Sequence, residues 1–218
     1  MLVPSQNISA AIVHLLSALM PPDYDSKGSL TLLKNLCNVA SSMLHVQTTN
    51  PVHFGSVFEF LEDFVHTHGD KIERSTLESV QGAAVNSHDK EAAGLLESLL
   101  LGTIAATRAS LGSVWTSPKE QGQGQSAFES KPPPAPKPGS VPNESLAGMF
   151  SLLQKLLGIC PVFTLNLPAG PGLDSEEDRL LRRAIDSAAA SLDDTDTDII
   201  VNAIVFLTTA VSFLCDYG

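Results

Sequence analysis

The chain has 218 residues, of which 43% are apolar and 6% aromatic, and its formal net charge is −11. This apolar content is typical of a globular protein with a core and excludes wholesale disorder. The negative charge argues against direct nucleic-acid binding, which depends on Lys and Arg neutralising phosphates, and it suits a basic protein partner.

Helical periodicity dominates the first half of the chain, and no sustained alternation of apolar and polar residues signals strands. Gly69 is the expected C-cap of the third helix, and Gly82 weakens the fourth from its middle. The predicted helices are Ile8 to Met20, Ser29 to Val46, Val52 to Thr67, Ser75 to about Asn86, and Asp89 to about Leu111.

A change of composition after Trp115 predicts a flexible Gly/Gln-rich and then Pro-rich linker at residues 116–143. It separates N-terminal helical repeats at 1–115 from C-terminal helical repeats at 144–218. The second part begins with an amphipathic helix from Ser145 to Gly158, which a short extended stretch from Cys160 to Pro168 follows.

The stretch from Glu176 to Cys215 predicts a helical hairpin. Its first helix, Glu176 to Leu192, is amphipathic, with Leu180, Leu181, Ile185, Ala188, Ala189 and Leu192 on the inward side. Its second helix, Thr197 to Cys215, is almost entirely apolar, with Asn202, Thr208, Thr209 and Ser212 as its polar interruptions, and is expected to be fully buried. The acidic turn between them carries residues that cap a helix start. The fold class predicted from these elements is all-α, with antiparallel helical hairpins stacked as a HEAT-like α-solenoid fragment.

No pattern typical of catalysis, cofactor binding or metal binding is present, so the sequence predicts a protein that is not an enzyme. His66 and His68 lie two residues apart, which puts them on different helix faces, and we interpret them as a polar helix end. The acidic turn resembles a calcium loop, but Ile199 stands where that loop requires glycine. The three cysteines, Cys37, Cys160 and Cys215, are expected to be buried free thiols.

The apolar run Ile199 to Cys215 leaves a second interpretation open, because 17 residues could span a thin bilayer. Asp198 and Asp216 bracket the run closely, and neither flank carries the basic residues that orient a membrane span. A buried solenoid helix is therefore the preferred interpretation, and a membrane is an unlikely partner.

Three stretches of the chain resemble late HEAT repeats of the karyopherin-β nuclear transport receptors, in the transportin-SR and importin-13 branch. They are LAGMFSLLQKLLGICPV (Leu146 to Val162), RAIDSAAASLDDTD (Arg183 to Asp196) and FLTTAV (Phe206 to Val211). Upstream, HFGSVFEFLEDFVHTHGD (His53 to Asp70) resembles the family's aromatic-rich helix that ends in an acidic patch. The Ran-binding N-terminal repeats of that family have no counterpart here, so Ran GTPase is a partner only if further repeats precede this chain.

The resemblance implies a scaffold in nucleocytoplasmic transport, present in cytoplasm and nucleus, whose protein cargo is basic or Arg/Ser-rich. The acids expected to contact such a partner are Glu59, Glu62, Asp63, Asp193, Asp194 and Asp196. Two alternatives remain: a HEAT/ARM-like adaptor unrelated to transport, and a single-span or membrane-associated protein that uses residues 199–215.

Overall fold

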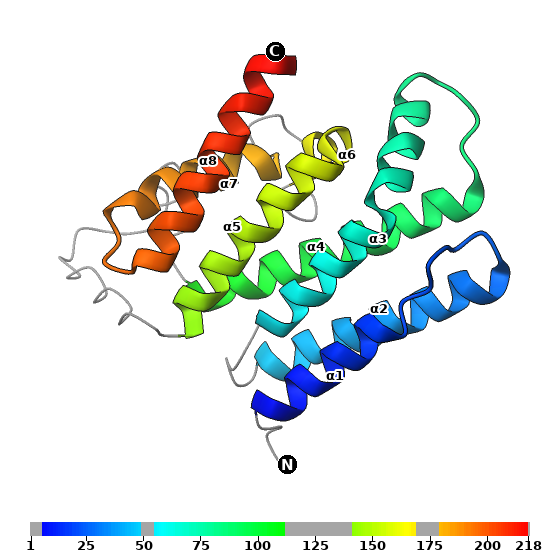
Figure 1. Ribbon diagram of the computed structural model, residues 1–218, viewed down its shortest axis with the longest axis horizontal. Helices are drawn as coiled ribbons and strands as arrows, with labels where there is room; N and C mark the ends of the chain where they lie inside the picture. The colour runs from blue at the N-terminus through cyan, green and yellow to red at the C-terminus, as the bar shows by residue number, and fades with distance from the viewer. Residues whose placement is uncertain (1–5, 49–54, 112–140, 169–178, 218) are drawn as a thin grey trace, which may run out of the picture.

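The computed structural model describes residues 6–48, 55–111, 141–168 and 179–217, and within them the chain is all-α (Figure 1). The described residues form no strand, and their one β-bridge pairs Pro168 with Arg179. The helices are α1 (Gln6–Ala18), α2 (Lys27–Thr48), α3 (Gly55–Val80), α4 (Ser87–Leu111), α5 (Val141–Ile159), α6 (Pro161–Asn166), α7 (Leu180–Ala190) and α8 (Thr197–Tyr217), with a short 3-10 turn, η4 (Ser191–Asp193), before α8.

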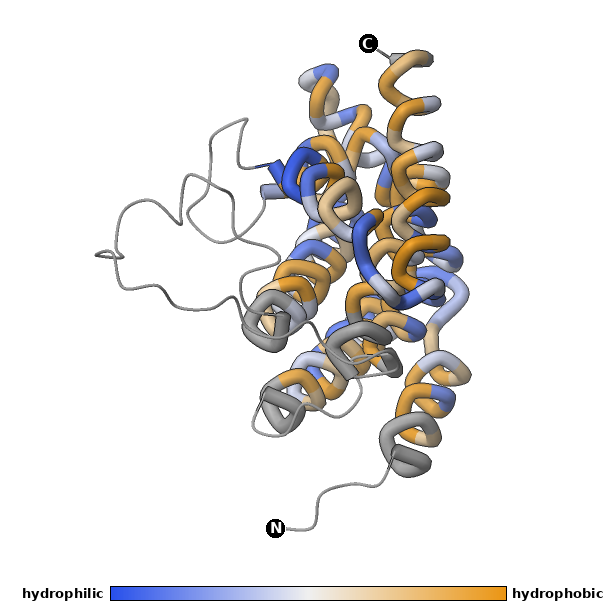
Figure 2. Tube along the Cα trace, turned by 90° about the vertical axis from the view of Figure 1, so that its left-hand side faces the viewer, coloured by the Kyte–Doolittle hydropathy of each residue, from blue (hydrophilic) through white to orange (hydrophobic). Residues whose placement is uncertain are grey.

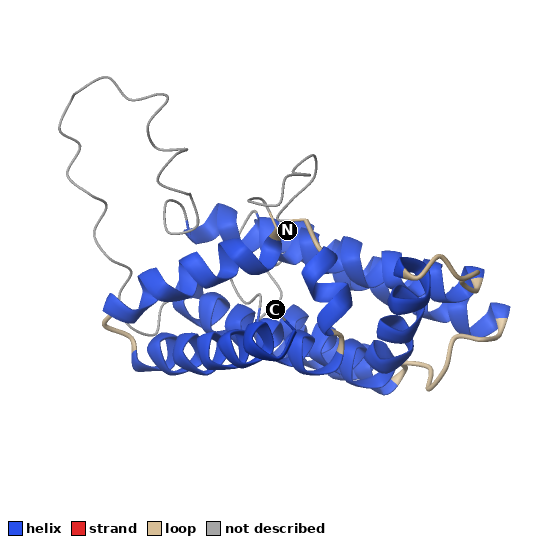
Figure 3. Cartoon of the chain, turned by 90° about the horizontal axis from the view of Figure 1, so that it is seen from above, coloured by secondary structure: helices blue, strands red, loops and turns tan. Residues whose placement is uncertain are grey.

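The helices are arranged in two layers (Figures 1 and 3). In the first layer α1 packs against α3, α3 against α5, and α5 against α8. Behind them α2 packs against α4, and α7 packs against α8. Helix α3 contacts both α4 and α5, so the helices on the two sides of the predicted linker share one core.

Helix α3 is longer than the sequence predicts, because two expected helices are one. It runs through Gly69 to Val80, so Gly69 does not cap a helix and the expected break between Thr67 and Ser75 is wrong. The terminator is Gly82, whose φ of +74° favours a residue without a Cβ. Gly82, which the sequence places in the middle of a predicted helix, therefore lies just after the end of α3.

Gly69 and Gly148 instead let α3 and α5 approach each other closely. A Cβ placed on Gly69 would lie 2.6 Å from Cγ2 of Ile159 on α5. A Cβ placed on Gly148 of α5 would lie 3.0 Å from Cδ2 of Phe58 on α3. At both points, the missing glycine side chain lets a side chain of the neighbouring helix lie directly against the helix backbone.

We expect Gly69→Ala to destabilise the protein although alanine is the better helix former. Overpacking costs about 1–3 kcal/mol, whereas the helix-propensity gain is only about 1 kcal/mol. Chemical denaturation should show the sign reversing in an Ile159→Ala background, where the clashing methyl group is absent. The matched control is Gly94→Ala on α4, which has no neighbouring heavy atom within 4 Å and should stabilise by about 0.5–1 kcal/mol. Equal stabilisation by both substitutions would contradict the close approach.

The segment expected to be extended, Cys160 to Pro168, instead contains α6. Pro161 occupies its first turn, where a missing N–H costs nothing. Helix α5 begins at Val141, within the segment 116–143 that the sequence predicts to be a linker. The rest of that linker, up to residue 140, lies outside the described residues, as do residues 169–178.

Candidate interaction surface

Helix α8 packs on α5 and α7 through one narrow seam. Its buried residues are spaced alternately four and three apart, the period of a coiled-coil seam, and they are Ile199, Ala203, Phe206, Ala210 and Phe213. The ring of Phe206 stacks on Phe150 of α5, with 5.8 Å between centroids and 14° between planes.

The expectation that α8 is fully buried is wrong, because the face opposite the seam is exposed and largely apolar. Val201, Ile204 and Val211 are 51%, 50% and 59% exposed, and Val205 is also exposed. Figure 2 shows α8, which ends at the C label, as a largely orange coil along one edge of the molecule. We call this face the outer stripe, and it consists of Val201, Ile204, Val205, Thr208, Val211, Ser212 and Cys215.

By length and composition alone, α8 is the one helix of the described residues that is long and apolar enough to cross a membrane. The span Thr197–Cys215 has 19 residues, and only 28% of its apolar window is buried in the protein. A soluble monomer rarely exposes a largely apolar helix face of this length, so the outer stripe is the candidate interaction surface of the described residues.

The acidic turn before α8 caps the helix, as the sequence predicts. Asp196 precedes the first residue of α8, and its Oδ1 accepts a hydrogen bond of 3.0 Å from the backbone N–H of Asp198. Asp194 Oδ1 accepts from the N–H of Asp196 at 2.9 Å. These carboxylates accept hydrogen bonds from backbone N–H groups that have no partner within the helix, at its positive end.

The six acids expected to contact a partner fall into two groups on different elements. On α3, Glu59 and Asp63 are exposed, whereas Glu62 is half-buried. The Glu62 carboxylate accepts a hydrogen bond of 2.9 Å from Ser151 Oγ and pairs with Lys155, both on α5. Glu62 thus joins α3 to α5, and its expected contact with a partner stays a prediction.

At the turn, Asp193 is exposed, whereas Asp194 and Asp196 are half-buried. Asp198, which the sequence treats only as a cap residue, is exposed beside them. The turn therefore presents Asp193 and Asp198 next to the start of the outer stripe.

Glu73 on α3 has a role that the sequence does not reveal. Its Oε1 and Oε2 accept the backbone N–H groups of Val162 at 2.9 Å and Phe163 at 3.0 Å. The N-terminus of α6 is thus capped by a side chain 89 and 90 residues earlier in the chain. No local pattern signals such a cap, since capping motifs are recognised within one turn of sequence.

We expect Glu73→Gln to lower the free energy of unfolding by about 1–2 kcal/mol, because one of two charge-assisted acceptors becomes a donor. Urea denaturation followed by circular dichroism measures this loss. The control is Glu59→Gln on the same helix, where the carboxylate is exposed and no change is expected. An unchanged denaturation midpoint in Glu73→Gln would contradict the cap.

His68 is buried in the middle of α3, so its interpretation as part of a polar helix end is wrong. Its ring lies edge-on to Tyr24 and Phe64, at centroid distances of 5.1 and 5.5 Å. Burial, with a smaller contribution from the positive charge of Lys71, lowers the pKa of His68 to about 4. His66 is exposed, and the described residues contain no cluster of three or more His, Cys, Asp or Glu side chains suited to a metal.

Lys71 anchors the connection between α1 and α2 beside His68. Its ammonium lies 4.3 Å from the ring centroid of Tyr24 and pairs with Asp25 and, at 3.7 Å, with Asp89 of α4. Burial, together with the negative charge of Asp89, raises the pKa of the fully buried Tyr24. These contacts are structural, because they tie a loop to two helices.

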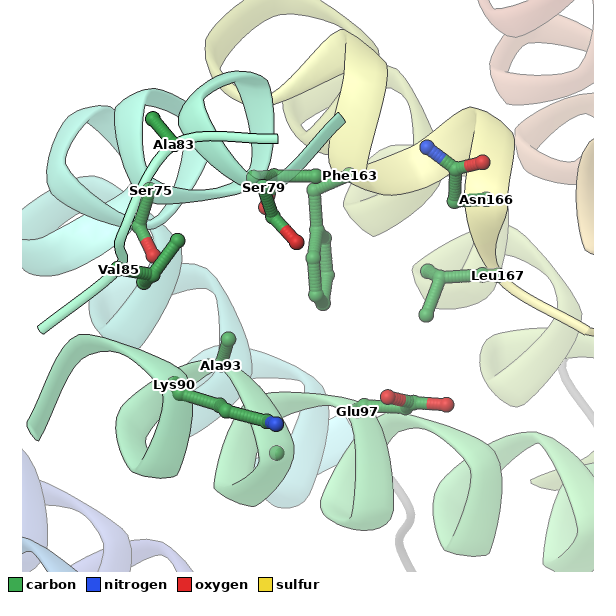
Figure 4. Close-up of a pocket in the computed structure, with 12 residues that line it drawn as sticks. Ser75, Ser79, Ala83, Val85, Lys90, Ala93, Glu97, Phe163, Asn166 and Leu167 are labelled. Atoms are coloured by element: carbon green, nitrogen blue, oxygen red, sulfur yellow. The ribbon is translucent and has the colours of Figure 1, made fainter. Parts of the chain in front are cut away.

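An open groove of about 560 Å³ lies between the end of α3, α4 and α6 (Figure 4). Phe163 points into it from α6, and Lys90 and Glu97 lie along its α4 wall. Ser75 and Ser79 add hydroxyl groups from α3. This mixture of polar and apolar side chains does not select one chemical class of ligand.

Two of the three cysteines are buried as expected, and the third is not. Burial raises the pKa of Cys37 and of Cys160 to about 12, so both thiols are protonated at neutral pH. Cys215 is exposed at the far end of the outer stripe. The expectation of three buried thiols is therefore wrong at Cys215, because α8 buries only its seam.

The sequence alone does not show which face of α8 is exposed. Apolar residues repeat the 4-3-4-3 spacing of the buried seam on a second face of the helix, at Ile200, Ile204, Leu207, Val211 and Leu214, so the spacing does not distinguish the covered face from the exposed one. No family model, curated protein or solved structure matches the chain.

Proposed function

We propose that this protein is an interaction scaffold, built as a HEAT-like α-solenoid, that binds a protein partner. The observation that carries the proposal is the outer stripe, because an apolar helix face left open at the edge of a helical stack is typical of a binding surface. The layered order, in which α1 packs on α3, α3 on α5 and α5 on α8, supports a solenoid.

The finer proposal is that the partner is transport cargo of a nuclear import receptor, basic or Arg/Ser-rich. Its support is the sequence resemblance to karyopherin-β receptors and the net charge of −11. Within the described residues, Glu59 and Asp63 on α3 and Asp193 near α8 offer exposed carboxylates for such a partner.

A binding assay tests this function directly. A fluorescein-labelled Arg/Ser-rich peptide is titrated with the full chain, and a peptide in which Glu replaces Arg serves as control. Saturable binding of the basic peptide alone, weakened by Glu59→Gln/Asp63→Asn, is the expected result. Absence of binding to the basic peptide would refute the cargo proposal. Cargo retained in pull-downs both with and without Ran-GTP would favour an adaptor unrelated to transport.

A second candidate function, membrane attachment through α8, is favoured by the length and exposure of that helix. Pelleting of the chain with membranes after carbonate extraction measures it. Resistance to carbonate would favour a span over residues 199–215 and would exclude the scaffold as proposed, whose helix α8 packs on α5.

A further inference from the structure

The outer stripe has the dimensions of a docking site for one helix. From Val201 to Cys215 it rises about 21 Å, at 1.5 Å per residue, which equals about four helical turns. It lies directly opposite the seam that α5 and α7 cover, so a partner there leaves the existing core in place. A largely apolar helix face of this length can accept the apolar face of an amphipathic helix.

Charge at the beginning of the stripe distinguishes between possible occupants. Asp193, Asp194, Asp196 and Asp198 precede it. No Lys or Arg follows Arg183 in the chain. The α8 helix of a second copy would therefore offer no basic residue to these acids in either orientation, and an anionic bilayer surface would be repelled by them. A partner helix with basic residues at the end that meets these acids complements the site.

The helix dipole then sets the direction in which the partner lies. Lys and Arg are favoured in the last turn of a helix, where they complement its negative end. A partner helix that runs antiparallel to α8 brings this last turn next to Asp193 and Asp198, both exposed. The parallel orientation would place its positive N-terminal end there, where basic residues are disfavoured.

We infer that the outer stripe of α8 binds an amphipathic helix of another protein, antiparallel to α8, with Lys or Arg in its last turn against the acidic turn. This inference rests on the proposed scaffold function and names the surface and the kind of partner. It does not depend on the transport cargo, because an Arg/Ser-rich segment without an apolar face does not fit the stripe.

The test uses the full chain and three synthetic 18-residue helical peptides with the same leucine stripe. One carries Lys and Arg in its last turn, the second carries them in its first turn, and the third carries Glu in its last turn. We expect fluorescence anisotropy to show about tenfold tighter binding of the first peptide than of either other. The Ile204→Ser/Val211→Ser variant should weaken its binding at least tenfold. The matched control, Leu15→Ser, alters an exposed leucine on α1 at the opposite end of the stack and should change nothing.

Two further measurements separate the parts of the inference. Asp193→Asn/Asp198→Asn should abolish the preference among the three peptides while the apolar contact remains. The exposed thiol of Cys215 provides a native reporter, and its rate of reaction with a thiol reagent should fall when the first peptide is bound.

The inference is overturned if Ile204→Ser/Val211→Ser binds the first peptide as well as the unmodified chain does, or if the chain binds the three peptides equally. Capture of the chain by neutral lipid vesicles in place of the peptides would assign the stripe to a membrane. Concentration-dependent dimers that this double variant abolishes would assign it to a second copy. Failure of the Arg/Ser-rich peptide alone would refute the cargo proposal and leave the docking site intact.

Discussion

Replacing Phe206 with alanine is expected to lower the free energy of unfolding by about 3–5 kcal/mol, as for other buried phenylalanines. Phe206 has no exposed surface and stacks on Phe150 across the contact between α8 and α5. Alanine leaves a cavity there and removes the ring contact. Denaturation in urea or by heat measures the loss.

A series at neighbouring positions of α8 makes this prediction specific to the seam. Val205→Ala changes the adjacent residue, which is exposed, and should alter stability by no more than about 0.5 kcal/mol. Phe206→Asp buries an unpaired charge and should detach α8, with loss of helicity as well as stability. A Phe206→Asp chain that keeps its helicity and melting temperature would contradict the packing of α8 on α5.

Lowering the pH from 7 to 5 is expected to destabilise the protein through His68. The folded state holds the pKa of His68 near 4, whereas in the unfolded chain it lies near its ordinary value of about 6.5. Between these values the unfolded chain binds the additional proton, so stability falls as pH falls through this window and is fully present above it. The loss from this group approaches about 2 kcal/mol at pH 5 and about 3 kcal/mol at pH 4.

The measurement is the difference in unfolding free energy between pH 7 and pH 5, compared among three chains. His68→Phe retains a ring next to Tyr24 and Phe64 and should lose this part of the pH dependence. His66→Gln, at an exposed position two residues earlier, should retain it. Titrating groups other than His66 and His68 are common to the three chains and cancel in the comparison. An identical pH dependence in His68→Phe would show that His68 is not held neutral by the fold.

The existence and helical type of most elements could be predicted because their signals are local. Apolar residues at three-and-four spacing predicted α1, α2, α4, α5 and α8 to within a few residues. The caps at Asp194 and Asp196 were also predictable, since a capping carboxylate lies within one turn of the N–H that it accepts. Solenoid stacking, nuclear transport and the choice of partner remain proposals.

The errors share a physical cause, which is that each depended on a neighbour distant in sequence. Gly69 reads as a cap, but its missing Cβ serves the contact with Ile159. Glu62 reads as a solvent-exposed acid, but Ser151 and Lys155 bind it. His68 reads as polar surface, but the α1–α2 connection supplies Tyr24 to cover it.

The sequence by itself determined that the chain is helical and that α8 is almost entirely apolar, since both follow from residue type and period. Only the tertiary structure decided which side of α8 is covered. Helix α8 packs on α5 and α7 through one seam, so Phe206 is buried while Ile204 and Val211 remain exposed. Burial depends on how much surface the neighbouring helices offer, which no local pattern records, and the neighbours of α8 leave the outer stripe uncovered.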